Sequence, residues 1–179
     1  MMTTIHGYTS DQKLHDGGHK DYRRARAAAL NIIPTSTGAT KAAAKAIPQL
    51  QGIFDGLAVR VPVPVGSLSD FTFLLKKATT VEEVNNTLKQ AADSARWKGI
   101  FTTTTDPVLS SDIIGNSHSS IADLSLTQVL GVTFCIGFLV GAVPFFLAWL
   151  FCTSTDLFVL RWFMDRANKQ HERELERDE

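Results

Sequence analysis

Two short clusters in the first 60 residues carry side chains that could act on an anion. His6 ends an apolar, strand-like segment and is followed by Gly7-Tyr8-Thr9, which brings a hydroxyl close to the imidazole in sequence. Arg60 stands between Val59 and Val61. A guanidinium in an apolar strand needs a negative partner, and a phosphate would supply one. A lone histidine is more often structural than catalytic, so each cluster alone is a weak signal.

A third cluster, Thr35-Ser36-Thr37-Gly38, comes directly before a predicted helix. Its hydroxyls and the amides of the helix N-terminus could together hold an anion. An ordinary helix N-cap is the competing interpretation. Arg23 and Arg24 could be solvated surface residues, and Asp112 and His118 could be turn residues. None of these groups predicts a function by itself.

These side chains need a framework of strands and short helices to bring them together. Thr80-Val81-Glu82-Glu83 is a capping box, and apolar residues at spacings of three and four follow it, which predicts a helix over 81–93. An Ala- and Lys-rich run predicts a helix over 39–47, ended by Pro48. The remaining patterns predict a short strand followed by a turn over 1–9, a polar loop over 10–21 and a brief helix over 23–30. They also predict strands over 56–62, 69–75, 99–105, 110–114 and 118–124. This mixture is typical of an α+β fold.

The charge of the chain excludes one class of partner. Its 179 residues hold 18 Lys and Arg against 18 Asp and Glu. No block is basic enough to indicate nucleic-acid binding, which requires a clustered positive face. On one helix Cys135 and Cys152 would lie about 25 Å apart, too far for a disulfide, so we expect small buried side chains at both positions.

Residues 129–152 form an uncharged stretch of 24 residues that also lacks His, Asn and Gln. As a helix this stretch would be about 36 Å long, more than the ~30 Å hydrocarbon core of a bilayer. The alternative is a buried helix of a soluble protein, but such helices seldom run this long without a polar face. We therefore expect a single-pass membrane protein with a folded domain over 1–128, a transmembrane helix over 129–152 and a charged tail over 153–179.

Taken together and in order, the clusters resemble the catalytic (C-terminal) domain of phosphorylating glyceraldehyde-3-phosphate dehydrogenases. Thr3–Gln12 resembles the segment around the catalytic histidine of that family. Asp21–Lys41 is similar to the family's S-loop and the phosphate-binding turn that follows it. Leu57–Pro62 is similar to the strand that bears the substrate-phosphate arginine. Val108–Asp112 and His118–Ile121 continue the match.

The resemblance implies a role for five residues. His6 would be the base that raises the thiolate character of the nucleophilic cysteine and assists hydride departure. Thr9 and Arg60 would hold the C3 phosphate of glyceraldehyde 3-phosphate. Thr37 and Gly38 would hold inorganic phosphate, which attacks the acyl-enzyme. In the family, NAD accepts the hydride.

The resemblance covers about residues 1–129 and leaves parts of the family out. The family's nucleophilic cysteine lies before the position that matches Met1, and the NAD-binding domain also precedes it, so we expect no cofactor for this chain alone. The expected fold is an incomplete α+β catalytic domain. It has a mixed or antiparallel sheet with helices on one face, and it is joined to one C-terminal transmembrane helix.

Three functions fit these features. The first is a fragment of an NAD-dependent oxidoreductase that is inactive alone. The second is a membrane-anchored, non-catalytic module that keeps the phosphate sites or the contacts with intact subunits of the family. The third is an active enzyme completed by a separate polypeptide that supplies the cysteine and the NAD domain. The expected partners are glyceraldehyde 3-phosphate, inorganic phosphate, intact subunits of the same family and a membrane, without nucleic acid.

Overall fold

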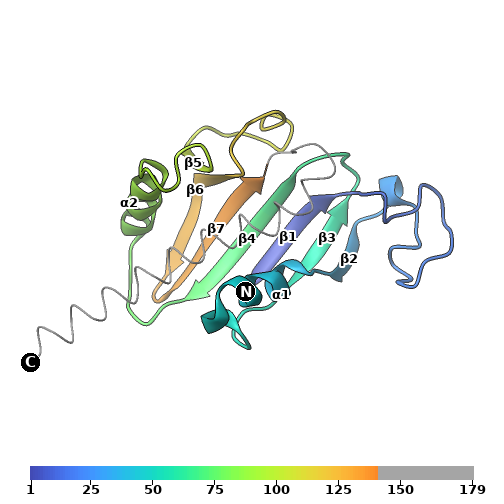
Figure 1. Cartoon of the computed structure of the whole chain (residues 1–179), viewed down its shortest axis with the longest axis horizontal. Coiled ribbons are helices and arrows are strands. Elements are labelled where there is room, and N and C mark those ends of the chain that lie inside the picture. The colour runs from blue at the N-terminus through green and yellow to red at the C-terminus, as the bar shows by residue number, and fades with distance from the viewer. Residues whose placement is uncertain (141–179) are drawn as a thin grey trace, which may run out of the picture.

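The computed structural model describes residues 1–140 and shows one mixed sheet with two α-helices (Figure 1). Seven strands are hydrogen-bonded in the order β2-β3-β1-β4-β7-β6-β5. The β1/β3 and β5/β6 pairs are parallel, and the other pairs are antiparallel. The strands are β1 (Met2–Gly7), β2 (Ile33–Ser36), β3 (Gly56–Val61), β4 (Ser67–Leu74), β5 (Phe101–Thr104), β6 (Ser120–Leu130) and β7 (Thr133–Val140). The predicted α+β fold with a mixed sheet is thus confirmed.

The longer helix, α2 (Val81–Ala92), begins at the predicted capping box. The Thr80 hydroxyl accepts from the Glu83 backbone N–H at 3.1 Å, and the Glu83 carboxylate accepts from the Thr80 N–H at 3.1 Å. The buried face of the helix is made by Val84, Leu88 and Ala91, at the predicted spacings of four and three. Capping satisfies the first amides, and burial of this stripe holds the helix on the sheet.

The shorter helix, α1 (Ala39–Ala46), buries Thr40 and Ala43 and ends before Pro48, as predicted. Two short 3₁₀-helices are also present, η1 (Ala28–Leu30) and η2 (Pro48–Leu50). The prediction of a helix over 23–30 was therefore wrong except for its last turn.

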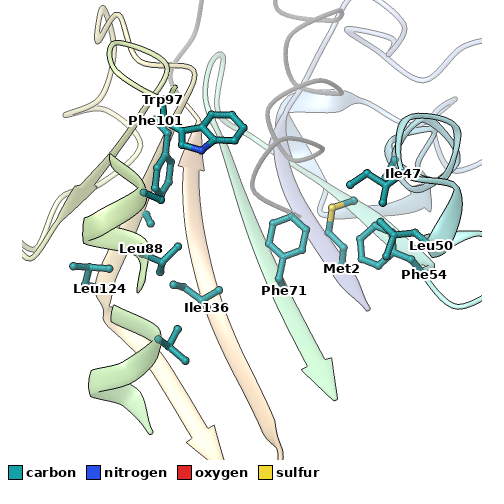
Figure 2. Close-up of a cluster of buried hydrophobic side chains, with 14 residues drawn as sticks. Met2, Ile47, Leu50, Phe54, Phe71, Leu88, Trp97, Phe101, Leu124 and Ile136 are labelled. Atoms are coloured by element: carbon teal, nitrogen blue, oxygen red, sulfur yellow. The ribbon is translucent and has the colours of Figure 1, made fainter. Parts of the chain in front are cut away.

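The main core lies on one face of the sheet, and both α-helices contribute to it (Figure 2). Met2 of β1 is opposite Phe71 of β4, and Phe71 is opposite Ile136 of β7, so these three side chains share that face. Their exposed fractions are 1%, 2% and 0%. Ile47 and Leu50 pack at the α1 end of this core, and α2 packs at the other end. The sheet and both helices therefore share one hydrophobic core.

The predicted transmembrane helix over 129–152 is wrong for its first half. Residues 129 and 130 end β6, and residues 133–140 form β7, which lies inside the sheet between β4 and β6. A two-residue turn joins the strands, with Gly131 at φ 63°, a conformation that glycine adopts readily. No helix among residues 1–140 is long and apolar enough to cross a membrane. The rest of the predicted helix, 141–152, and the predicted tail, 153–179, lie outside the described residues.

The uncharged run has a physical explanation in the sheet order. A strand that is hydrogen-bonded on both sides and covered on its faces has few positions where a polar side chain can meet water. β7 is hydrogen-bonded to β4 on one side and to β6 on the other, and its sequence is an almost continuous apolar run. Periodicity alone does not separate a buried strand from a buried helix.

Residues 110–114, predicted as a strand, form turns instead. The Asp112 carboxylate accepts the Leu109 backbone N–H at 2.6 Å, which stabilises a turn rather than an extended chain. His118 lies near Asn116, whose side-chain oxygen accepts the His118 backbone N–H at 2.9 Å. Asp112 is thus a turn residue, the structural alternative of the sequence analysis, and His118 lies in the irregular segment before β6.

Candidate anion-binding site at the carboxyl ends of β1 and β3

His6 and Arg60 lie side by side at the carboxyl ends of two parallel strands. β1 and β3 pair in a register that sets His6 directly opposite Arg60. Residues opposite each other in a ladder project to the same face of the sheet. Carboxyl ends of parallel strands are common places for binding sites. Two residues 54 positions apart in the sequence are thus brought together by the β1/β3 pairing.

Thr9 joins this pair through the Arg60 side chain. Arg60 Nη1 donates to Thr9 Oγ1 at 3.0 Å and makes a longer contact of 3.5 Å with the Gly7 carbonyl oxygen. The Arg60 guanidinium thus points toward the His6–Thr9 segment. A hydroxyl beside a guanidinium offers two donors to the same anion.

Gly7 allows the chain to turn away from the sheet at this point. A Cβ added at Gly7 would lie 2.7 Å from the Val63 carbonyl oxygen, closer than real Cβ atoms approach a backbone oxygen. Tyr8 N donates to that same oxygen at 3.0 Å, and Gly7 N donates to the Gly66 oxygen at 3.1 Å. The glycine after His6 is thus needed for the close approach of two backbone segments that carries Thr9 to Arg60.

The environment of His6 suits a base. Burial lowers the pKa of His6, the hydrogen bond with the Gly7 carbonyl raises it, and the charge of Arg60 lowers it; the net direction is downward. The imidazole is therefore neutral at pH 7. His6 Nδ1 is 2.6 Å from the Gly7 carbonyl oxygen, which can only accept a hydrogen bond. The proton of neutral His6 thus sits on Nδ1, and the Nε2 lone pair can accept a proton.

Thr37 and Gly38 lie away from this pair. β2 runs antiparallel to β3, with Ile33 opposite Arg60 but Ser36 opposite Leu57. Residues beyond Ser36 are thus displaced from Arg60 by at least three strand positions, roughly 10 Å at ~3.3 Å per residue. The Thr37 hydroxyl accepts the Ala39 N–H at 3.1 Å, a local contact at the start of α1. The structure thus brings together His6, Thr9 and Arg60 but separates them from the Thr37–Gly38 turn.

Arg24, which the sequence analysis left as a solvated residue, is tied to the turn region. Its guanidinium pairs with Asp11 at 2.7 Å and Asp21 at 3.4 Å. It also donates to the Thr35 hydroxyl at 2.9 Å and to the Ser36 carbonyl at 3.1 Å. The signal was present in the sequence, because the loop holds aspartates at positions 11, 16 and 21 against the Arg-rich run at 23–26. Arg24 thus fastens loop 10–31 to β2.

Cys135, the free thiol among residues 1–140, is not part of this site. It lies opposite Thr72, and the neighbouring Phe71 faces the helices, so Thr72 and Cys135 project to the other face. Cys135 Sγ is 3.4 Å from the Thr72 hydroxyl. His6 and Cys135 thus face opposite sides of the sheet.

The other face of the sheet also carries a cavity of about 480 Å³. Its lining is mostly apolar and includes Ile5, Leu68, Val108 and Leu126. None of the five residues predicted for the site lines it. The candidate site is therefore the polar end of the helix-covered face and not this cavity.

The sequence of this domain also matches a known protein family. The model of the family "Glyceraldehyde 3-phosphate dehydrogenase, C-terminal domain" matches residues 1–136. The chain therefore belongs to the glyceraldehyde-3-phosphate dehydrogenase family, through that family's C-terminal domain. The match covers this domain only, and the family's NAD-binding domain is not among the matched residues.

Three curated relatives show the extent of the similarity. The chain is 56% identical over 130 residues to glyceraldehyde-3-phosphate dehydrogenase of Mycobacterium avium, covering 73% of this chain and 38% of that protein. It is 55% identical over 131 residues to the enzyme of Borreliella burgdorferi, covering 73% and 39%. It is 53% identical over 131 residues to glyceraldehyde-3-phosphate dehydrogenase 1 of Streptomyces avermitilis, covering 73% and 39%. The match thus spans less than two fifths of each relative.

Proposed function

We propose that this chain is the part of a glycolytic glyceraldehyde-3-phosphate dehydrogenase that supplies the base and the phosphate-binding groups. In this proposal Arg60 and Thr9 hold the C3 phosphate of glyceraldehyde 3-phosphate, and His6 accepts a proton near the reacting carbon. Thr37 and Gly38 hold inorganic phosphate at a separate position. The observation that carries the proposal is the 3.0 Å bond from Arg60 Nη1 to Thr9 Oγ1, made beside a histidine that burial keeps neutral.

The separation of the two phosphate-binding pairs is consistent with two different phosphates. One substrate phosphate and one attacking phosphate cannot occupy the same donors at the same time. Arg60 lies at the carboxyl end of β3, where it contacts Thr9, whereas Thr37 and Gly38 follow Ser36, which is opposite Leu57 near the amino end of β3. The two pairs are displaced along the sheet by roughly 10 Å of backbone, and binding two anions at separate positions weakens their mutual repulsion in water.

Oxidation of the aldehyde requires a nucleophilic thiolate and a hydride acceptor, and in the family these come from a cysteine and NAD. Cys135 cannot serve, because it projects to the face opposite His6. In this proposal the matched residues bind phosphate groups and supply a base but do not complete the reaction by themselves. The alternative of a membrane-anchored binding module is not favoured, because residues 129–140 belong to the sheet.

A phosphate titration of the ¹⁵N-labelled full chain tests the proposal. Inorganic phosphate should shift the NMR signals of His6, Thr9 and Arg60 in the native chain, with weak but saturable binding. Arg60→Gln should weaken this binding at least tenfold, because a charge-assisted contact contributes ~1.5–3 kcal/mol. Lys77→Gln, an exposed charge change in a turn, should leave it unchanged. If phosphate shifts no signal near His6, or if both variants bind as the native chain does, the proposed site is wrong.

A further inference from the structure

Gln12 is the buried residue of an otherwise exposed turn. Its exposed fraction is 8%, while Ser10, Asp11 and Lys13 around it are exposed. Glutamine is seldom buried without hydrogen-bond partners, because its amide loses water on both its oxygen and its nitrogen. Neither the proposed function nor the core uses this side chain. Its contacts therefore need an explanation.

Those contacts close the turn on Thr9 from both directions. The Gln12 backbone N–H donates to the Thr9 carbonyl oxygen at 2.9 Å. In return, the Gln12 side-chain oxygen Oε1 accepts the Thr9 backbone N–H at 3.3 Å. Both backbone groups of Thr9 are thus satisfied by one residue. The Thr9 hydroxyl stays available for the bond from Arg60 Nη1 at 3.0 Å.

The other polar atom of the Gln12 side chain is the amide nitrogen, Nε2. Nε2 is buried and has no hydrogen-bond partner among residues 1–140. A buried donor without an acceptor costs about 1–3 kcal/mol, so such a donor in a folded protein requires an explanation, such as a functional role or a bound water or ion. Since Nε2 and Oε1 are bonded to the same carbon, this donor lies close to the Thr9 backbone.

We propose that Gln12 is a positioning residue of the anion site, which fixes the Thr9 backbone so that the Thr9 hydroxyl and the Arg60 guanidinium face one phosphate group together. This inference rests on the proposed function. Gln12 acts through Thr9, and its Nε2 group supplies a donor that phosphate oxygens or an ordered water satisfy when the site is filled. Without Gln12 the Thr9–Gln12 turn loses the side-chain half of its closure.

Two variants and one control separate this role from simple packing. Gln12→Leu keeps the bulk of the side chain but removes both polar atoms. Gln12→Glu keeps the acceptor for the Thr9 N–H and removes the Nε2 donor. Gln51→Leu is the control, because Gln51 is an exposed glutamine outside the site. Two quantities are measured on the full chain: the hydrogen-exchange rate of the Thr9 amide without ligand, and the dissociation constant for inorganic phosphate.

In Gln12→Leu the Thr9 amide should exchange about fivefold faster, the factor for one ordinary hydrogen bond, and phosphate should bind at least fivefold more weakly. Gln12→Glu should keep the Thr9 amide protected to within twofold of the native rate, which a merely structural role would not produce. It should bind phosphate more weakly, because it adds a negative charge. Gln51→Leu should match the native chain in both measurements.

Two results would overturn the inference. One is a Thr9 amide that exchanges at the native rate in Gln12→Leu, and the other is native phosphate affinity in that variant. If Gln12→Leu does not fold, Gln12→Asn replaces it, because the shorter amide remains polar but does not reach the Thr9 N–H. An unchanged exchange rate of the Thr9 amide in Gln12→Asn also overturns the inference. A native chain that binds no phosphate refutes the proposed function instead, and the Thr9 exchange rates still decide whether Gln12 holds Thr9.

Discussion

The side chains at the two ends of β1, Met2 and His6, lie on the same face of the sheet but differ in their chemistry. At the amino end Met2 packs against Phe71 in the core shared by both α-helices. At the carboxyl end His6 lies beside Arg60. Between them, Thr4 is buried and accepts a hydrogen bond from the Ser69 hydroxyl at 3.3 Å. The polarity thus changes from apolar to ionisable within five residues.

A single strand thus contributes both to the stability of the core and to the chemistry of the site. A half-buried charge is tolerated when polar groups surround it, and the Arg60 guanidinium donates to the Thr9 hydroxyl and to the Gly7 carbonyl oxygen. Apolar contacts at the Met2 end hold the strand and fix the register that brings His6 to Arg60. We therefore expect substitutions at the apolar end to change the free energy of unfolding, and substitutions at the polar end to change the titration of His6.

The largest expected effect is on the apolar side. Leu88 of α2 has an exposed fraction of 0%, so Leu88→Ala leaves a cavity under the helix. It should lower the free energy of unfolding by about 2–5 kcal/mol. Leu74→Ala is the control, because Leu74 is 79% exposed, and it should change stability by less than ~0.5 kcal/mol. Denaturant unfolding of the full chain measures both. Equal effects of the two variants would contradict the assignment of the core.

A smaller effect, on titration rather than on stability, is expected at the polar end. Arg60→Gln removes a positive charge beside His6, so the lowered pKa of His6 should rise toward its ordinary value while burial still holds it below. Histidine NMR signals followed from pH 4 to 8 give this pKa, and a His6→Gln variant identifies the His6 signal. A His6 pKa that does not move, or that falls further, would show that Arg60 does not act on His6.

The same shift predicts how stability depends on pH. The unfolded chain binds a proton at His6 near its ordinary pKa of 6.5, whereas the folded chain binds it only at lower pH. The folded state should therefore lose stability as the pH falls below 6.5, and it should lose less in Arg60→Gln. Denaturant midpoints at pH 7.5 and 5.5 measure the difference. A midpoint that rises on acidification would contradict the direction of the shift.

The smallest effect is expected in loop 10–31. Hydrogen bonds lower the pKa of Asp21, chiefly that from Thr35, and of Asp16, chiefly that from Ala27. Burial raises the pKa of Asp11, but hydrogen bonds from His19 and Arg24 lower it more. The contribution of these carboxylates is thus full above pH 3.8 and lost as the pH falls through their lower folded pKa values. Because the carboxylates are largely exposed, only a local effect is expected. As the pH falls, the protection of backbone amides from hydrogen exchange should decrease in loop 10–31 before it decreases in β4. Loss of protection in both segments at the same pH would contradict this prediction.

Much of this fold could be predicted where a local signal decides the structure. The capping box at Thr80 and Glu83 and the spacing of Val84, Leu88 and Ala91 define α2 within the sequence itself. The strand with Arg60 was predicted from its apolar flanks, and the meeting of Arg60 with Thr9 followed from the family resemblance. These features need no knowledge of distant contacts beyond the one pairing that the resemblance supplied.

The failures occurred where the deciding contacts are distant in sequence. β7 was predicted as part of a transmembrane helix because its apolar run reflects neighbours on both sides, β4 and β6, which a sequence window does not contain. The turn signal at Gly131 was hidden inside the same run. Arg24 looked solvated because its partners Asp11 and Ser36 lie 13 and 12 residues away. Gln12 showed no signal, since its role depends on a turn and on burial.

The order of the strands also affects how readily the edges of this sheet can pair with the strands of other chains. Among residues 1–140 the outermost strands are β2 and β5, and each has four residues. An open strand is a template on which a foreign chain can add, and short edges with proline make poor templates. β2 carries Pro34, which has no N–H to offer to an incoming strand. The long, apolar strand β7 lies instead between β4 and β6, so the sheet shields from foreign strands a segment whose apolar, uncharged sequence favours amyloid-like pairing.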